Sequence, residues 1–332
     1  MSEQSTSPPR PAPTLSEVLE TVERLWPMHL QEPWDASGLV TGRPDQPVRR
    51  ILFAVDPVAG VVAEAVSTGA DLLVTHHPLL LRGVTSVAAD GFKGAVVHEL
   101  IERRCALLAC HTNADSAPDG VSDAVARAAG LTTTTPLAPH PADPTVGIGR
   151  VGDLARPVRL RELARRLADA VPPTAHGVRV AGDPDALVRR VAVCGGAGDS
   201  LFDAVRSSGA DVYVTADLRH HPASEAREAA LGPGAGGTPY LVDLSHFASE
   251  WLWLPVGAAA LREALAARGH DVQVDVSERC SDPWDFRLDH PGHDGSDLVR
   301  SGHDRSALDH PDHPDHDRSA LDPAAPTAGG PA

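Results

Sequence analysis

A helix followed by a buried strand occurs twice in this chain of 332 residues, and this repeat constrains the fold more than any other feature. Residues 69–75 and 209–215 both begin Gly-Ala-Asp and end Val-Thr, and the helical segments before them, 63–68 and 203–208, match in size and polarity. Short apolar runs between turn residues are typical of buried strands. We therefore predict two related α/β halves, although common helix–strand units can also resemble one another by chance.

Strands alternate with helices along the first half of the chain. The apolar pattern predicts strands over 50–56, 71–75 and 105–110, and helices from Thr14 to Leu25 and over 58–68, 93–103 and 118–129. Thr14 and Glu17 have the spacing of a capping box, which marks the start of the first helix. This alternation favours an α/β architecture over separate all-α and all-β blocks.

Composition divides the chain further. We predict a disordered N-terminus (1–13), a first α/β half (14–135), a short connecting insert (136–188), a second α/β half (189–281) and a disordered tail (282–332). The tail is rich in Asp, His, Pro and Gly, from which no core can be built. Its histidines could bind metal loosely, and the alternative is a solvated segment without a defined site.

Charge and cysteine usage restrict the partners and the compartment. The formal net charge of −16 argues against general binding to nucleic acid or to an acidic membrane surface. No apolar run is long enough to cross a bilayer, and the polar, Pro-rich start lacks a signal-peptide pattern. The four cysteines form no Cys-x-x-Cys pair, which favours reduced thiols. We therefore expect a cytoplasmic protein.

Two adjacent histidines stand at the end of a predicted buried strand. His76 and His77 follow the run 71–75, and Pro78 comes directly after them. Successive strand side chains point to opposite faces, so both rings converge only if the strand stops there. Pro78 favours such a stop because it cannot continue the ladder of hydrogen bonds. The pair could bind metal ions, or it could simply terminate the strand.

Three more candidate ligands follow other predicted strands. Asp115 lies past the run 106–110, while His246 and Glu250 follow the run 240–243 and share one helix face because they are four residues apart. Each has an ordinary alternative, a helix cap for Asp115 and an exposed helix pair for the other two. Imidazole and carboxylate ligands suit Zn, Mn, Fe or Co, and one carboxylate can bridge two ions.

Two other segments are weaker candidates. The Gly-rich turn 194–199 lies between a strand and a helix, a context that can bind phosphate, but it lacks the Walker lysine and the full dinucleotide pattern. A tight turn with Asp199 or Ser200 as the helix N-cap is the alternative. His221, in a His-His-Pro sequence at the end of a longer loop, could contribute a ring to the same cleft or none.

Several segments together resemble a known family. They are Trp-Asp-Ala-Ser-Gly-Leu at 34–39, Thr-His-His-Pro at 75–78, His-Thr-Asn-Ala-Asp at 111–115, and the segments 147–152, 191–198 and 246–250. In this order, from about residue 14 to 281, they resemble the GTP cyclohydrolase I type 2, or NIF-three-like, family. Ala36, Ala114 and residues 219–222 depart from the family's usual sequence, which puts a substrate contact at Ala36 or near His221 in doubt.

The resemblance implies a fold, an assembly and a metal site. It implies two similar α/β domains of the NIF-three-like fold, a toroidal homohexamer and a dinuclear metal centre. The implied ligands of its two divalent ions are His76, His77, Asp115, His246 and Glu250, with Glu250 as the bridge. These five positions are the ones that the strand-end argument selects.

Our leading functional hypothesis is a metal-dependent hydrolase that acts on a nucleotide such as GTP. Two ions would activate water and stabilise the developing negative charge. His111 and His221 are the candidate proton shuttles, because both could lie near the ions without serving as ligands. The rival hypothesis is a non-catalytic protein that stores, delivers or senses metal. A nucleotide- or protein-binding module with structural metals is a third possibility.

Overall fold

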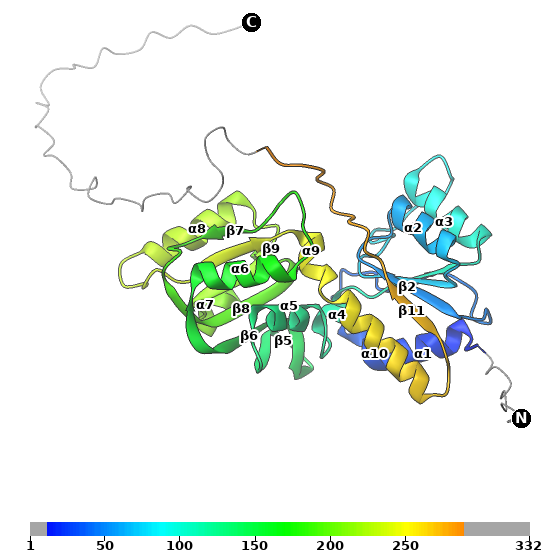
Figure 1. The fold of residues 1–332 in the computed structure, drawn as a ribbon, viewed down its shortest axis with the longest axis horizontal. Helices are drawn as coiled ribbons and strands as arrows, with labels where there is room; N and C mark the ends of the chain where they lie inside the picture. The colour runs from blue at the N-terminus through cyan, green and yellow to red at the C-terminus, as the bar shows by residue number, and fades with distance from the viewer. Residues whose placement is uncertain (1–11, 289–332) are drawn as a thin grey trace, which may run out of the picture. The chain divides into compact units, whose positions relative to one another are not determined.

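A computed structural model describes residues 12–288 of the protein, and two mixed sheets dominate it (Figure 1). In the first sheet the strand order is β1-β4-β3-β2-β11. Its strands are β1 (Gly38–Thr41), β2 (Arg50–Ala54), β3 (Leu72–Thr75), β4 (Ala106–Ala109) and β11 (Gln273–Val276). Four of these strands are parallel and β1 pairs antiparallel with β4, so the carboxyl ends of β2, β3 and β4 meet at one edge.

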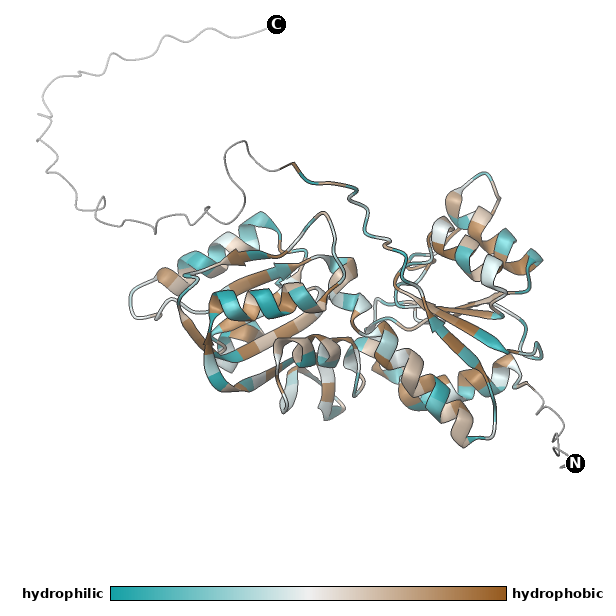
Figure 2. Cartoon of the chain, in the orientation of Figure 1, coloured by the Kyte–Doolittle hydropathy of each residue, from teal (hydrophilic) through white to brown (hydrophobic). Residues whose placement is uncertain are grey.

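Helices cover both faces of the first sheet. Phe53 and Val74 belong to a core shared with α1 (Leu15–Leu25) and α10 (Leu254–Ala267). Their neighbours in the two strands, Leu52 and Leu73, belong to a core on the opposite face. That face is covered by α2 (Ala59–Thr68) and α3 (Phe92–Glu102). The central strands are therefore apolar on both faces, as their brown colour in Figure 2 illustrates.

The second sheet has the strand order β5-β6-β8-β9-β10-β7. Its strands are β5 (Thr134–His140), β6 (Asp143–Arg159), β7 (Arg179–Ala181), β8 (Leu187–Ala197), β9 (Val212–Ala216) and β10 (Tyr240–Leu244). The central strands β8, β9 and β10 are parallel. One face packs against α5 (Val121–Ala129) and α6 (Leu160–Ala170), and the other against α7 (Phe202–Ser208) and α8 (His220–Leu231). The α/β class predicted from the sequence is confirmed, with one sheet in each half.

The repeated helix–strand unit has the same internal contacts in both halves. Gly69 and Gly209 end α2 and α7 in the left-handed conformation, with φ of 71° and 68°. The Asp71 carboxylate accepts hydrogen bonds from two successive backbone amides at the start of β2, and the Asp211 carboxylate does the same at β8. The shared Gly-Ala-Asp sequence thus specifies a helix stop and a link to the neighbouring strand.

The described structure differs from the predicted boundaries in several places. The segment 136–188 supplies β6, β7 and most of β5, so it forms part of the second sheet and not a separate connection. In contrast, β11 comes late in the chain but pairs with β2 of the first sheet. Of the predicted disordered ends, 1–11 and 289–332 lie outside the described residues. Within 12–288, no helix combines the length and apolar character needed to span a bilayer.

Two local predictions also need correction. Residues 111–115 are not a plain loop, because α4 (Thr112–Ser116) forms a short helix there. His221 does not end a long loop but lies in the first turn of α8. The remaining short elements are the 3-10 helices η1 (Met28–Leu30) and η2 (Asp199–Leu201) and the helix α9 (His246–Trp251).

Candidate metal centre

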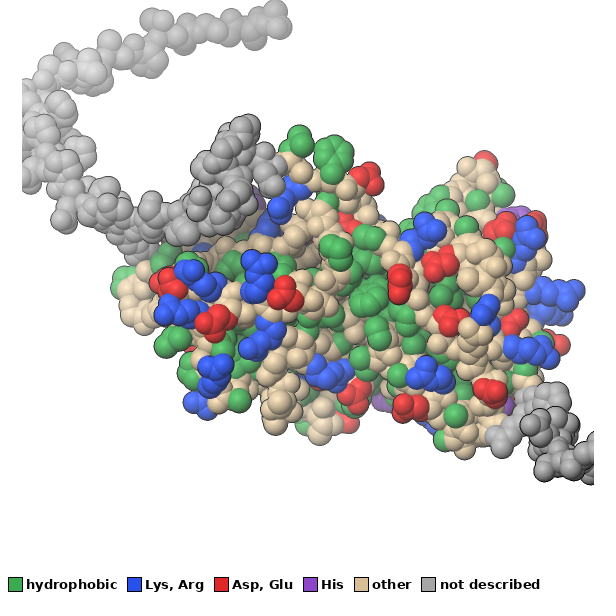
Figure 3. All heavy atoms as spheres, in the orientation of Figure 1, with side chains coloured by type: hydrophobic (Ala, Val, Ile, Leu, Met, Phe, Trp, Pro, Cys, Tyr) green, Lys and Arg blue, Asp and Glu red, His purple; other side chains and the backbone are tan. Residues whose placement is uncertain are grey.

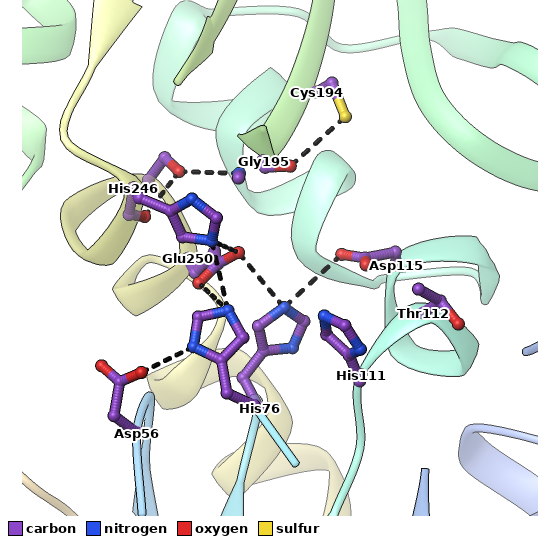
Figure 4. A network of polar contacts seen from close by, with 12 residues as sticks. Asp56, His76, His111, Thr112, Asp115, Cys194, Gly195, His246 and Glu250 are labelled. Carbon is purple, nitrogen blue, oxygen red and sulfur yellow. Dashed lines mark hydrogen bonds and ion pairs between the residues drawn. The ribbon is translucent and has the colours of Figure 1, made fainter. Parts of the chain in front are cut away.

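The predicted ligands of both halves come together in one cluster (Figure 4). The backbone amides of His76 and His77 donate to the carbonyls of Ala54 and Val55, at 3.1 and 2.9 Å, which extends the pairing of β3 with β2 beyond the strand end. The Thr75 hydroxyl then donates to the His77 carbonyl at 2.8 Å and closes a turn. This turn lets two neighbouring rings approach the same point.

Glu250 lies at the centre of the cluster. Its side chain is 3% exposed, and its Oε1 lies 2.9 Å from His246 Nε2 and 3.4 Å from His76 Nε2. Its other oxygen, Oε2, lies 3.1 Å from His77 Nε2. Glu250 is therefore no exposed helix partner of His246, and one buried carboxylate faces three imidazole nitrogens, an arrangement suited to bridging two ions.

Asp115 and His111 complete the cluster on the side of α4. Asp115 Oδ1 lies 3.9 Å from His76 Nε2. Asp115 does not serve as a cap of α5, whose N-cap residue is Gly120 with no side-chain cap. Nitrogens of His76, His77 and His111 lie within 4.8 Å of one another, and so do ligand atoms of His77, His246 and Glu250. The two groups share His77.

Each imidazole of the cluster is held at Nδ1, which leaves Nε2 directed at the centre. The Nδ1 partners are the Cys110 carbonyl for His76 (2.9 Å), Asp56 for His77 (2.7 Å), Asp217 for His246 (2.8 Å) and Asp35 for His111 (2.7 Å). A carbonyl only accepts, so Nδ1 of His76 carries a proton, and any lone pair that the ring offers to a metal ion is on Nε2. Such outer partners fix the orientation of metal-binding histidines.

Sequence reasoning missed the three aspartates among these partners. Asp56 and Asp217 follow the carboxyl ends of β2 and β9, a signal that was available at the same sheet edges as the ligands. Asp35 lies in the turn-rich segment 34–39, where only the resemblance drew attention to it. Distances between side chains, which the sequence does not contain, distinguish these aspartates from others in similar positions.

The electrostatics of the cluster favour cations. Burial lowers the pKa of His77, but the charges of Glu250 and Asp56 outweigh burial and raise it to about 10. The charge of Glu250, opposed by burial, raises the pKa of His246 to about 11. Burial raises the pKa of Glu250, yet the three neighbouring histidines together hold it well below its ordinary value. In each case the buried carboxylate stabilises positive charge beside it.

Two further observations show that the residues fit metal ions. Among the described residues, the buried atoms His76 Nε2 and Glu250 Oε2 lie 3.4 and 3.1 Å from the nearest ligand atoms but without the geometry of a hydrogen bond, an arrangement that a bound cation would satisfy. Gly196, at the end of β8, has φ of +66°, and a Cβ atom there would lie 2.4 Å from Glu250 Oε1. The backbone of the second sheet thus approaches the carboxylate as closely as glycine permits.

The weaker candidates lie elsewhere. His221 is exposed, and its described ring contact is with His220 at 5.2 Å between centroids. Neither metal-binding group contains His221, so its predicted role as a proton shuttle gains no geometric support. The predicted Gly-rich turn 194–199 is not a single turn, because residues 194–197 belong to β8 and Asp199 begins η2. Gly196 packs against the cluster, and α7 has no side-chain N-cap from Asp199 or Ser200.

Fold and site define a class: a two-sheet α/β protein with a buried histidine–carboxylate cluster that could hold metal. The chain belongs to the Duf34/NIF3 (NGG1p interacting factor 3) family, whose model matches residues 13–283. The resemblance found in the sequence is therefore confirmed.

Relatives and solved structures agree with this assignment. A Streptomyces coelicolor protein named GTP cyclohydrolase 1 type 2 homolog is 56% identical over 274 residues, covering 82% of this chain and 94% of the relative. A Mycobacterium tuberculosis protein of the same name is 35% identical, covering 83% and 97%. The crystal structure of a Bacillus cereus protein related to NIF3 has a TM-score of 0.76 and 25% identity, covering 84% and 100%. Reduced HcgD from Methanocaldococcus jannaschii has a TM-score of 0.65 and 26% identity, covering 80% and 98%.

Proposed function

We propose that this protein is a metal-dependent hydrolase that binds two divalent ions and acts on a purine nucleotide such as GTP. The observation that carries the metal dependence is the position of Glu250, whose buried carboxylate faces the Nε2 atoms of three histidines. The nucleotide is suggested by the family resemblance and by the name of the relatives, GTP cyclohydrolase 1 type 2 homolog.

Five side chains of this chain would hold the ions. They are His76, His77, Asp115, His246 and Glu250, with Glu250 shared. When bound, divalent ions supply an activated water and stabilise negative charge that develops on the substrate. The aspartates at Nδ1 of His77 and His246 would keep both rings oriented for this purpose.

His111 is the residue that we propose moves a proton. Its ring lies 5.1 Å from the His76 ring, measured between centroids, while its Nδ1 is held by Asp35. Burial raises the pKa of Asp35, but hydrogen bonds from His111 and Thr112 outweigh burial and lower it, so Asp35 remains charged. A charged Asp35 fixes the ring with Nε2 free to accept or donate a proton at the centre.

The test is turnover by protein reconstituted with Zn²⁺, Mn²⁺, Fe²⁺ or Co²⁺ in turn, with GTP as substrate and formate or another ring-opened product as the readout. We expect slow turnover that His76→Ala abolishes. His111→Ala should lower the rate by about 10²- to 10⁴-fold, the usual contribution of general acid–base catalysis. Elemental analysis of this variant checks that the ions are retained, because His111 also belongs to one of the two groups of close ligand atoms. Absence of turnover with every ion and nucleotide tried would contradict the proposal.

Metal delivery or storage is the second candidate, and the partial exposure of the cluster favours it. The side chains of His246 and His77 are 31% and 22% exposed, so a partner or chelator could reach them. Ion release distinguishes the two functions, because an enzyme retains its ions through turnover. Loss of the ions to a weak chelator within seconds, together with no turnover, would establish the carrier.

A further inference from the structure

The segment that follows β11 makes hydrogen bonds to residues that neighbour the candidate ligands of both halves. We call residues 277–282 the clamp segment; it lies at the orange end of the described chain in Figure 1. The backbone amide of Ser277 donates to the Phe53 carbonyl in β2 at 2.8 Å. The Ser277 carbonyl accepts from the indole of Trp251 in α9 at 3.0 Å. The clamp segment therefore starts at a point where the first sheet meets the helix that carries His246 and Glu250.

Ser281 reaches the histidine pair of the first half through one carboxylate. The Ser281 hydroxyl donates to Asp56 Oδ2, and the other oxygen of Asp56 lies 2.7 Å from Nδ1 of His77. The two oxygens of Asp56 thus have separate partners, one on the clamp segment and one on the candidate ligand. Movement of Ser281 would free the carboxylate that orients the His77 ring.

Asp282, the next residue, reaches the helix of the second half. The hydroxyl of Ser245 donates to Asp282 Oδ2. Ser245 is the N-cap of α9, is 3% exposed, and accepts from the backbone amide of Ala248 at 3.3 Å. Asp282 therefore holds the side chain that starts the helix on which two candidate ligands lie.

We propose that Ser281 and Asp282 are positioning residues that fasten the histidine pair of the first half, His76 and His77, to the helix α9 of the second half, which carries His246 and Glu250. Side chains of adjacent residues in extended chain point in different directions, so a two-residue sequence can bind one group on each side. Neither residue reaches the centre itself; Ser281 acts through Asp56, and Asp282 acts through Ser245. This inference rests on the proposed metal centre, because the ligands are positioned in order to bind ions. The positioning itself can be measured in metal-free protein by hydrogen exchange.

The experiment uses the full chain with Ser281→Ala and with Asp282→Ala. Ser207→Ala is the matched control, because the Ser207 hydroxyl donates to the Asp203 carbonyl within α7 and has no described link to the cluster.

In metal-free protein we expect faster hydrogen exchange confined to α9 and the turn at residues 76–78 in both the Ser281→Ala and the Asp282→Ala variant. With Zn²⁺ or Mn²⁺ and a competing chelator, both dissociation constants should rise about 10- to 100-fold, the usual effect of losing an outer partner. Ser281→Thr, which keeps the hydroxyl, should restore the wild-type exchange and affinity.

Two outcomes would contradict the proposed role of Ser281 and Asp282. One is that Ser281→Ala and Asp282→Ala show the same hydrogen exchange and the same ion affinity as Ser207→Ala. The other is an increase of exchange throughout the molecule, which indicates general destabilisation and no local positioning. If the wild-type protein binds no ion, the proposed metal centre fails, and the exchange measurement still decides whether the clamp exists. If ions bind tightly but GTP is not turned over, the proposed hydrolase function is wrong. The dissociation constants of the variants for Zn²⁺ or Mn²⁺ then still test the role of the clamp segment.

Discussion

At the scale of the single residue, the site depends on a glycine as much as on its ligands. The Gly196 amide donates to the Ser249 hydroxyl at 2.9 Å, which holds the end of β8 beside the helix that carries Glu250. The backbone φ of Gly196 is +66°, and a Cβ atom added there would lie only 2.4 Å from Glu250 Oε1, so no side chain fits. Gly196, near the end of β8, therefore shapes the candidate metal site.

Gly196→Ala should abolish ion binding without removing a ligand. Gly209→Ala is the matched control, because Gly209 has a similar φ of +68° but no atom within 4 Å of the added Cβ. Left-handed strain should lower the stability of both variants by about 1–2 kcal/mol, and the close contact with Glu250 should lower that of Gly196→Ala further. Thermal unfolding checks this order, and elemental analysis should find ions only in Gly209→Ala. Full ion content in folded Gly196→Ala would show that the glycine does not shape the site.

At the scale of the element, a buried carboxylate near the end of β10 links this strand to β7 and to two connecting segments. Asp243 accepts hydrogen bonds from Arg179 in β7 and from the Leu218 amide before α8, and lies 3.1 Å from His176 Nε2. Burial raises its pKa, but these partners outweigh burial, and the pKa is lowered. Asp243 thus holds the strand from which α9 begins.

Asp243→Asn should make the protein less stable by about 1–3 kcal/mol at pH 7, the cost of disturbing buried hydrogen bonds. The folded pKa of Asp243 lies below its unfolded value of about 3.9, so its stabilisation is complete above that pH and is lost as the pH falls through the folded pKa. Urea unfolding from pH 7 to pH 3 should therefore show a gap between wild type and variant that narrows below about pH 4. A gap that stays constant or widens there would contradict the lowered pKa.

Some features of these elements could be predicted from the sequence, and others could not. The helix–strand repeat, the capping box at Thr14 and the shared face of His246 and Glu250 depend on local spacing, and the structure has them as predicted. Strand order depends on distant pairing, so the placement of β11 in the first sheet had no local signal. The short helix α4 was missed because no side chain caps its start. Asp282 was assigned to the tail by composition, although it contacts Ser245.

At the scale of the whole molecule, we propose a homohexamer, which rests on the family resemblance. On the face drawn in Figure 3, acidic and basic side chains are interspersed, so no large field of one sign opposes association there. Light scattering at micromolar concentration should give about six times the chain mass of 34.7 kDa. A monomeric mass under these conditions would refute the assembly.

The central claim is that the cluster around Glu250, and not the histidine-rich tail, holds two ions in each chain. Elemental analysis after dialysis tests it in the full chain, in a chain that ends at Arg287, the last residue of the compact unit that includes the cluster, and in Glu250→Gln. We predict about two ions per chain in the first two proteins and fewer than one in Glu250→Gln, because the proposed bridge would serve both ions. Circular dichroism must show that Glu250→Gln is folded. Loss of the ions on removal of the residues after Arg287, with full retention in Glu250→Gln, would contradict the account.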